Sequence, residues 1–194
     1  MKFVPREIDV ASFDDSSRLK SILSKPLVPP LQFYKTTPAA FDPHWGTDHA
    51  ACFDLKACLE AGTTVKIYDS GNVALEVQIV SNFLYIMPGS RVMIPTGLIF
   101  DIPVGYSVRV HSRSGLSLKQ GLVLANHEGV IDSDYVDPTM IVVKNDSKVS
   151  VIVTHGDRIA QAEMVPDIAY CVEEISDKPQ QKTNRQGGFG STGK

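Results

Sequence analysis

The chain has 194 residues, 43% of them hydrophobic, and a formal net charge of −3 at neutral pH. A single domain of this length buries about 70% of the surface of its unfolded chain, so it needs no disulfide or structural metal for stability. Lysine and arginine are spread along the sequence without a basic block, which argues against a protein that binds nucleic acid along its length.

The cysteines and the first residues indicate where the protein works. Cys52, Cys58 and Cys171 are odd in number and show neither a C-x-x-C pair nor a histidine at zinc spacing. This pattern favours reduced thiols in the cytoplasm, or in the host cytoplasm if the chain is viral. Residues 1–10 have no apolar stretch typical of a secretion signal, and the apolar runs are too short to span a bilayer. We therefore expect no membrane partner and no nucleic-acid partner.

Residues 1–30 read as an N-terminal extension that is partly helical. Ser12 is a suitable cap for an amphipathic helix over residues 12–25, and Pro26 ends that pattern. The Pro29-Pro30 pair separates this arm from the chain that follows.

From Val65 onward the chain alternates short β-rich segments with turns, and no stretch there has a sustained helical period. Asp69-Ser70-Gly71-Asn72 is typical of a hairpin turn. The pattern predicts an all-β fold, either an antiparallel β-barrel or a jelly roll. The predicted strands are residues 73–80, 83–87, 91–100, 107–111, 140–143 and 149–153.

Five segments carry polar residues and glycines that strand formation does not require. The first, residues 50–57, is an apolar run with one carboxylate, Asp54, which reads as a structural residue, in a turn or a salt bridge, as readily as a functional one. The second places a guanidinium, a hydroxyl and a bare glycine amide in a row, at Arg113, Ser114 and Gly115. Such a tripeptide can cradle an anion, although it also occurs by chance in loops.

The third segment, residues 126–135, is the richest in polar groups. The Asn126 amide carries both a donor and an acceptor and can read the edge of a base. Asp132 follows two apolar residues and is expected to be partly buried, and Tyr135 can stack on a sugar. Each also has a structural interpretation, because Asn126 suits a turn and Tyr135 suits the core.

The last two segments lie nearer the C-terminus. Residues 156–161 predict a tight turn that enters a strand, with Asp157 and Arg158 bracing neighbouring loops. Residues 185–193 place four glycines, an arginine and two hydroxyl residues around Phe189, which suits a flap that closes on a phosphorylated aromatic ligand. Taken alone, this stretch reads equally well as a disordered polar terminus.

Together the five segments resemble, in order and spacing, the five motifs of the trimeric dUTP pyrophosphatase (dUTPase) family, over residues 31–193. The most specific matches are Arg-Ser-Gly-Leu, Gly-Val-Ile-Asp-Ser-Asp-Tyr, Gly-Asp-Arg-Ile-Ala-Gln and Gly-Gly-Phe-Gly-Ser-Thr-Gly. The resemblance implies a distorted jelly-roll domain over residues 31–178, with an inserted hairpin at 63–83. A flexible C-terminal arm would follow over residues 179–194.

The resemblance also implies an activity, the hydrolysis of dUTP to dUMP and pyrophosphate by attack of water on the α-phosphorus. This reaction keeps uracil out of DNA and supplies dUMP for thymidylate synthesis. Asp132 would be the catalytic base. Mg²⁺ would bridge the three phosphates and keep several waters, and Asp54 would contact those waters as an outer-shell partner.

The resemblance further implies a homotrimer in which each active site is shared between subunits and the tail comes from another chain. The second segment and Gln161 would hold the phosphates, and a hairpin from Asn126 to Met140, which contains the third segment, would hold the uracil and deoxyribose. The tail would close over the site, with Phe189 stacked on uracil. The implied substrate-binding residues are Arg113, Ser114, Gly115, Asn126, Val130, Ile131, Tyr135, Met140, Gln161, Arg185, Phe189, Gly190, Ser191 and Thr192.

Two departures from the family pattern bear on the site. Val136-Asp137-Pro138 follows Tyr135, where the family has Arg or Gln and then Gly. Arg185 stands four residues before Phe189 rather than five, so its contact with the γ-phosphate is left open.

Two other functions compete with this one. A dCTP deaminase shares the fold but uses a glutamate on the strand after the third segment, and residues 140–143 contain no carboxylate. A regulatory protein could instead use the N-terminal extension or the inserted hairpin to bind a partner. Asp132, Ser114 and Phe189 argue against lost catalysis, while an added binding role stays open.

Overall fold

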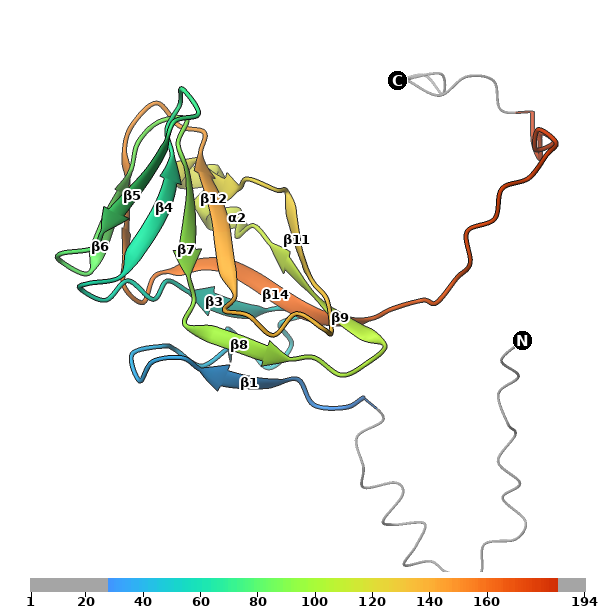
Figure 1. The fold of residues 1–194 in the computed structure, drawn as a ribbon, viewed down its shortest axis with the longest axis horizontal. Coiled ribbons are helices and arrows are strands. Elements are labelled where there is room, and N and C mark those ends of the chain that lie inside the picture. The colour runs from blue at the N-terminus through green and yellow to red at the C-terminus, as the bar shows by residue number, and fades with distance from the viewer. Residues whose placement is uncertain (1–27, 185–194) are drawn as a thin grey trace, which may run out of the picture.

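The structure is a computed structural model that describes residues 28–184, and its chain forms two five-stranded antiparallel sheets and two two-stranded ladders (Figure 1). The first sheet has the order β10 (Leu122–Leu124), β12 (Met140–Asn145), β7 (Arg91–Pro95), β4 (Thr64–Tyr68), β5 (Ala74–Gln78). The second has the order β11 (Glu128–Ile131), β9 (Tyr106–His111), β14 (Arg158–Pro166), β3 (Phe53–Lys56), β2 (His44–Trp45). The ladders pair β1 (Gln32–Lys35) with β8 (Leu98–Asp101) and β6 (Phe83–Ile86) with β13 (Val151–Thr154).

The core draws side chains from both sheets. Burial alternates along β7 and β12, so that Val92, Ile94, Ile141 and Val143 point inward while their neighbours are partly exposed. Phe100 of β8 is 2% exposed and belongs to the same core. The predicted all-β, jelly-roll-like fold is thus confirmed.

One predicted strand, residues 91–100, is divided in two at Thr96-Gly97. Gly97 has a φ of +71°, and a Cβ added there would lie 2.7 Å from the Cβ of Ala40. The Thr96 hydroxyl donates a hydrogen bond of 2.8 Å to the carbonyl oxygen of Thr139. The prediction of one continuous strand is wrong, because this corner takes the chain out of the first sheet and into the ladder with β1.

The sequence analysis missed one helix after Val65, α2 (Ser114–Gln120), which has 7 residues. Arg113 is its N-cap, and Gly121 ends it with a left-handed φ of 66°. No residue of α2 is buried. A helix this short and this exposed leaves no apolar periodicity in the sequence.

The hairpin predicted around residues 69–72 is present between β4 and β5. The Asp69 carboxylate accepts a hydrogen bond of 2.8 Å from the backbone N–H of Val73 and closes the turn. The hairpin extends the first sheet at its edge, because β4 pairs with β7 on its other side.

The chain after β14 leaves the sheets. Residues 167–184 contain no helix or strand and lead away from the β domain (Figure 1). Their apolar side chains are largely exposed, among them Ile168, Tyr170 and Val172. The helix predicted over residues 12–25 lies outside the described residues. In the described part, no helix is long and apolar enough to cross a membrane.

Candidate active site

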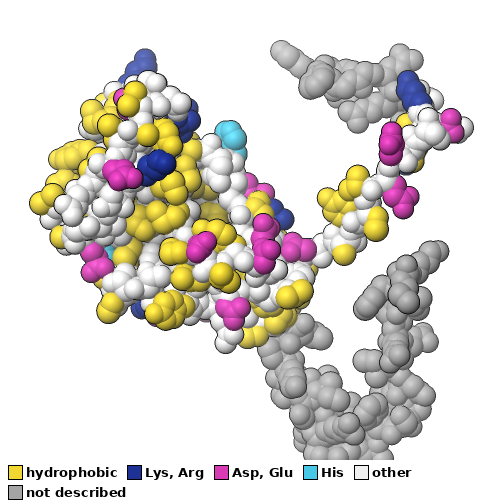
Figure 2. All heavy atoms as spheres, viewed as in Figure 1, with side chains coloured by type: hydrophobic (Ala, Val, Ile, Leu, Met, Phe, Trp, Pro, Cys, Tyr) yellow, Lys and Arg dark blue, Asp and Glu magenta, His cyan; other side chains and the backbone are white. Residues whose placement is uncertain are grey.

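A pocket of about 270 Å³ lies between β11 of the second sheet and β12 of the first. In the space-filling view, hydrophobic side chains gather over the middle of the face that carries β7 and β12, with charged side chains around them (Figure 2). Five predicted substrate-binding residues line this pocket, namely Asn126, Val130, Ile131, Tyr135 and Met140.

A tight turn positions the Asn126 side chain. His127 has a φ of 62°, and the N–H of Glu128 donates a hydrogen bond of 2.7 Å to the carbonyl oxygen of Asn126. Gly129 leaves room beside it, since a Cβ there would lie 3.0 Å from the Cβ of Val110 and 3.7 Å from the amide nitrogen of Asn126. Asn126 therefore stands at a turn, as one interpretation of the sequence predicted, and it also lines the pocket.

Residues 132–139 cross from one sheet to the other. The sequence suggested a hairpin from Asn126 to Met140, but β11 pairs with β9, whereas β12 pairs with β7 and β10. The hairpin prediction is wrong, and the pocket lies between two sheets rather than within one ribbon.

Asp132 lies at the rim of this pocket. It directly follows Ile131, and its carbonyl oxygen accepts a hydrogen bond of 3.1 Å from the N–H of Tyr135. Its side chain is exposed. The expected partial burial is therefore wrong for the single chain, because β11 ends at Ile131 and the crossover carries Asp132 outward. Tyr135 is 42% exposed, so it does not belong to the core.

Thr139 is a pocket residue that the sequence analysis missed. It is 3% exposed, and its hydroxyl is a buried group without a hydrogen-bond partner among the described residues. A buried hydroxyl without a partner costs free energy unless a ligand or water bonds it. Its only signal in the sequence is a hydroxyl residue directly before an apolar strand.

A second group of predicted residues lies at the other end of the second sheet. The Asp54 carboxylate accepts hydrogen bonds from Arg113 Nε at 2.8 Å and from an Arg158 guanidinium nitrogen at 3.1 Å. The side chain of Asp54 is 10% exposed. The salt-bridge interpretation of Asp54 is confirmed, and the Arg158 side chain joins β14 to strand β3 rather than bracing a neighbouring loop.

The other members of this group surround that ion pair. Gln161 pairs with Asp54 in the sheet, and its amide donates a hydrogen bond of 3.1 Å to the carbonyl oxygen of Ser112. Ser114 and Gly115 are exposed at the start of α2, and a Cβ on Gly115 would meet nothing within 4 Å. The group therefore presents an open, polar surface.

The two groups are far apart in one chain. Ile131 pairs with Val108, so Asp132 comes level with Ser107 at the start of β9, whereas Arg113 follows the end of β9. Six residues of extended chain separate Ser107 from Arg113, or about 20 Å. The remaining predicted residues, Arg185, Phe189, Gly190, Ser191 and Thr192, lie outside the described residues.

A second pocket adjoins the first. It has a volume of about 420 Å³ and shares Met93, Asn126 and Val142 with its neighbour. The β4–β5 hairpin contributes Tyr68, whose ring centroid lies 5.6 Å from the Arg91 guanidinium. The hairpin therefore extends the apolar groove beyond the predicted base pocket.

Comparisons with known proteins agree with this arrangement. The family model of dUTPase matches residues 62–193. The deoxyuridine 5'-triphosphate nucleotidohydrolase of Dinoroseobacter shibae is 40% identical over 152 residues, which are 78% of this chain and 87% of the relative.

Solved structures show the same fold. A mutant Staphylococcus bacteriophage 80alpha dUTPase with dUpNHpp has a TM-score of 0.67 at 21% identity, covering 86% of this chain and 99% of that chain. A mutant dUTPase of phage phi11 of S. aureus, described with a structural Mg(II) ion, has a TM-score of 0.60 at 20% identity, covering 78% of this chain and 100% of that chain. With the family model and the 40% identical relative, these findings confirm the resemblance: this chain belongs to the dUTPase family.

Proposed function

We propose that the reaction of the dUTPase family, hydrolysis of dUTP to dUMP and pyrophosphate, takes place at the pocket between β11 and β12, with Asp132 as the general base. The observation that carries this proposal is the position of Asp132 between two pocket residues, Ile131 and Tyr135. An exposed carboxylate at the rim can take a proton from a water that attacks a phosphate lying outside the pocket. General-base assistance of this kind contributes about 10²–10⁴-fold to the rate.

The base of the nucleotide would enter the pocket. Asn126 offers an amide donor and acceptor, the backbone of Val130 and Ile131 adds further polar groups, and Thr139 offers its unpartnered hydroxyl. Cytosine presents a different donor and acceptor pattern from uracil, and a buried polar group left without a partner discriminates strongly against the wrong base. Tyr135 would contact the deoxyribose, and Met140 would complete the wall.

The phosphates would bind the group around Arg113, Ser114, Gly115 and Gln161. Exposed backbone N–H groups at the start of α2 and the guanidinium of Arg113 offer donors to phosphate oxygens. Arg185, Gly190, Ser191 and Thr192 of the tail would add contacts on the terminal phosphates, and Phe189 would cover the base. Positioning and charge stabilisation of this kind account for most phosphoryl-transfer catalysis.

Mg²⁺ is used by the family, and the donors here fit an outer-shell role for Asp54. Each carboxylate oxygen of Asp54 accepts one hydrogen bond from an arginine and keeps a second lone pair, which can bond a metal-bound water. Two guanidiniums beside the carboxylate disfavour direct ligation of a cation. The ion would neutralise phosphate charge, and the substrate itself would supply its direct ligands.

A homotrimer with shared sites is the assembly we propose. The separation of about 20 Å between Asp132 and Arg113 along β9 means that one chain does not bring both to the same triphosphate. The exposed apolar side chains of residues 167–184 support an arm that reaches a neighbouring subunit. The three free cysteines support a reducing compartment such as the cytoplasm.

Turnover assays with dUTP, dCTP and dTTP test the activity. We expect release of pyrophosphate and dUMP from dUTP, with dCTP and dTTP turned over at least about 10²-fold more slowly. Deamination of dCTP would support the competing function instead. A nucleotide-inactive protein would leave only a binding role.

A subunit-mixing assay tests the shared site separately. Chains carrying Asp132→Asn and chains that end at residue 184 are each expected to be nearly inactive. Mixed trimers should recover activity, because some sites then combine an intact Asp132 with an intact tail. Activity no greater than the sum of the two parents would contradict sharing of the site between subunits.

A further inference from the structure

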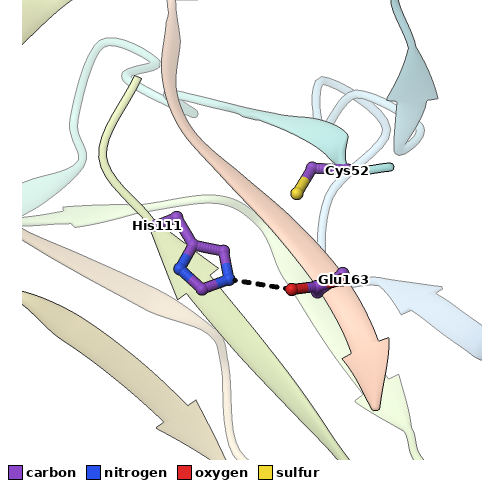
Figure 3. A group of neighbouring side chains, drawn as sticks. All are labelled: Cys52, His111 and Glu163. Carbon is purple, nitrogen blue, oxygen red and sulfur yellow. Dashed lines mark ion pairs between the residues drawn. The ribbon is translucent and has the colours of Figure 1, made fainter. Parts of the chain in front are cut away.

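We propose that Cys52, His111 and Glu163 bind a Zn²⁺ ion. One ligand atom from each side chain, a sulfur, a ring nitrogen and a carboxylate oxygen, lies within 4.8 Å of the other two (Figure 3). All three side chains are partly buried. The site belongs to the second sheet, and none of the three side chains is among those that line the base pocket.

The register of the second sheet brings these residues together. Phe53 pairs with Ala162, so Cys52, the residue directly before β3, comes level with Glu163 on β14. His111 of β9 pairs with Gln161, which is two residues from Glu163 and therefore on the same face of the sheet. Strands β9 and β14 and the residue that leads into β3 thus each contribute one ligand, although the residues are far apart in the sequence.

The imidazole of His111 has the surroundings of a metal-bound histidine. Its Nε2 is shielded from solvent and makes no hydrogen bond, because Glu163 Oε1 is close, at 3.3 Å, but not aligned to accept one. Its Nδ1 lies 3.7 Å from Glu128 Oε1 on the opposite side. Metal-bound histidines use one ring nitrogen for the ion and direct the other to a carboxylate in this way.

The donor set selects zinc over the hard cations. Sulfur and imidazole nitrogen suit Zn²⁺, whereas Mg²⁺ and Ca²⁺ require oxygen ligands. A thiolate, a carboxylate and a neutral imidazole together balance the charge of a divalent ion. Three protein ligands leave a fourth tetrahedral position for water.

The free Cys52 thiol holds a proton that zinc would displace. Burial raises the pKa of Cys52, and the carboxylates of Glu163 and Asp54 raise it further. Binding would break the S–H bond, form the Zn–S bond and release the proton to solvent.

The position of the site suggests what the ion does. Cys52, His111 and Glu163 are each two residues from Asp54, Arg113 and Gln161, respectively, along the three strands. Zinc would tie β3, β9 and β14 together beside the group proposed to hold the phosphates. This positioning role rests on the proposed function, whereas zinc binding itself does not.

Titration of the untagged, metal-free protein with Zn²⁺ and Co²⁺ tests the site without any nucleotide. We expect one ion bound per chain, thiolate-to-cobalt absorption in the near ultraviolet, and the visible bands of tetrahedral cobalt. Excess Mg²⁺ should displace neither ion. Absence of the thiolate absorption would overturn the proposal, and this result is independent of whether dUTP is hydrolysed.

Variants locate the ligands. Cys52→Ser should abolish the thiolate absorption and weaken Zn²⁺ binding by at least about 100-fold. Cys171→Ser, at an exposed cysteine of the C-terminal segment, is the matched control and should leave both unchanged. Glu163→Gln, at a side chain that is 39% exposed, is a second ligand variant whose fold is checked by its melting temperature without metal. Unchanged binding in both Cys52→Ser and Glu163→Gln would overturn the site.

Glu128→Gln distinguishes a site in which His111 is a ligand from metal binding by Cys52 alone. It should keep the thiolate absorption of the cobalt protein but weaken zinc binding about 10- to 100-fold, because the charge that orients His111 is removed. Equal zinc affinity in Glu128→Gln and the unchanged protein would show that His111 is not held as a ligand.

Discussion

The pocket proposed to bind the base and the set of residues proposed to bind the phosphates are built on different physical principles. The pocket between β11 and β12 is largely apolar and holds a hydroxyl without a partner at Thr139. The second set, around Asp54 and Arg113, is charged, and its Asp54 carboxylate is paired with the guanidiniums of Arg113 and Arg158. Recognition in the pocket therefore depends on shape, and recognition by the residues around Asp54 and Arg113 depends on charge.

This difference predicts how substitutions divide. Substitutions in the pocket should alter discrimination between nucleotides and leave the fold intact. Substitutions among the residues around Asp54 and Arg113, which are proposed to bind the phosphates, should alter both stability and triphosphate binding. The variants below test this division, from the largest expected effect to the smallest.

Asp132→Asn should have the largest effect, because it removes the proposed base from the rim of the pocket. We expect kcat to fall at least about 10²-fold with little change in dUTP binding, as measured by single-turnover kinetics and equilibrium binding. Asp137→Asn makes the same change at another exposed carboxylate of the same crossover and should retain activity. Full turnover by the first variant would show that Asp132 is not the base.

Arg185→Ala should weaken dUTP but not dUMP, if Arg185 reaches the γ-phosphate despite its shifted place in the tail. A charge-assisted hydrogen bond contributes about 1.5–3 kcal/mol, which is roughly ten- to a hundred-fold in affinity. Binding of both nucleotides by calorimetry measures the difference. Equal dUTP affinity before and after substitution would turn attention to Lys182→Ala, since Lys182 is the competing source of charge.

Asp54→Asn should destabilise the protein, because two guanidiniums lose their carboxylate at a site that is 10% exposed. We expect the free energy of unfolding to fall by about 1–3 kcal/mol in urea denaturation. The surface pair of Lys35 and Asp42 supplies the control, since Asp42 is 67% exposed and Asp42→Asn should cost less than about 1 kcal/mol. Equal costs would mean that the Asp54 pair contributes no more than a surface salt bridge.

Thr139→Val and Thr96→Val compare two buried hydroxyls of the same region. The Thr139 hydroxyl has no partner in the free protein, so its loss should leave stability unchanged or higher while dUTP affinity falls about three- to ten-fold. The Thr96 hydroxyl donates to the Thr139 carbonyl, so its loss should cost about 1 kcal/mol of stability instead. Denaturation and KM measured on both variants test this. A destabilised Thr139→Val with unchanged KM would place that hydroxyl in the fold and not in the site.

Much of the fold was predictable where local patterns decide the structure. The turn at residues 69–72 and the strands that became β5, β6, β9, β12 and β13 follow from turn chemistry and alternation. The turn at Gly156, with a φ of 88°, leads into β14 as expected. Where long-range contacts decide, prediction failed. The corner at Gly97 depends on the close approach of Ala40, a residue far away in the sequence.

The residues of the sites divide in the same way into those that local sequence patterns identify and those that long-range contacts bring together. Asn126, Tyr135 and Met140 come together because they lie on one stretch of chain, from the turn before β11 through the crossover to the start of β12, and their motif identifies them. The cluster of Cys52, His111 and Glu163 has no motif, because only the register of three strands brings it together. Spacing rules for zinc ligands assume loops or helices, and a ligand set spread over three strands of a sheet does not follow them.

The exposed segment over residues 167–184 also affects how binding of the tail to a neighbouring site depends on protein concentration. In the proposed trimer it tethers the tail residues to the assembly, which holds them near a neighbouring site at an effective concentration on the order of millimolar. The tail then needs only weak intrinsic affinity for a bound nucleotide, and it can let the product go quickly. Diluting the enzyme leaves this local concentration unchanged until the subunits themselves separate. Residues whose apolar side chains are largely exposed in the single chain thus set how occupancy of the closed site responds to protein concentration.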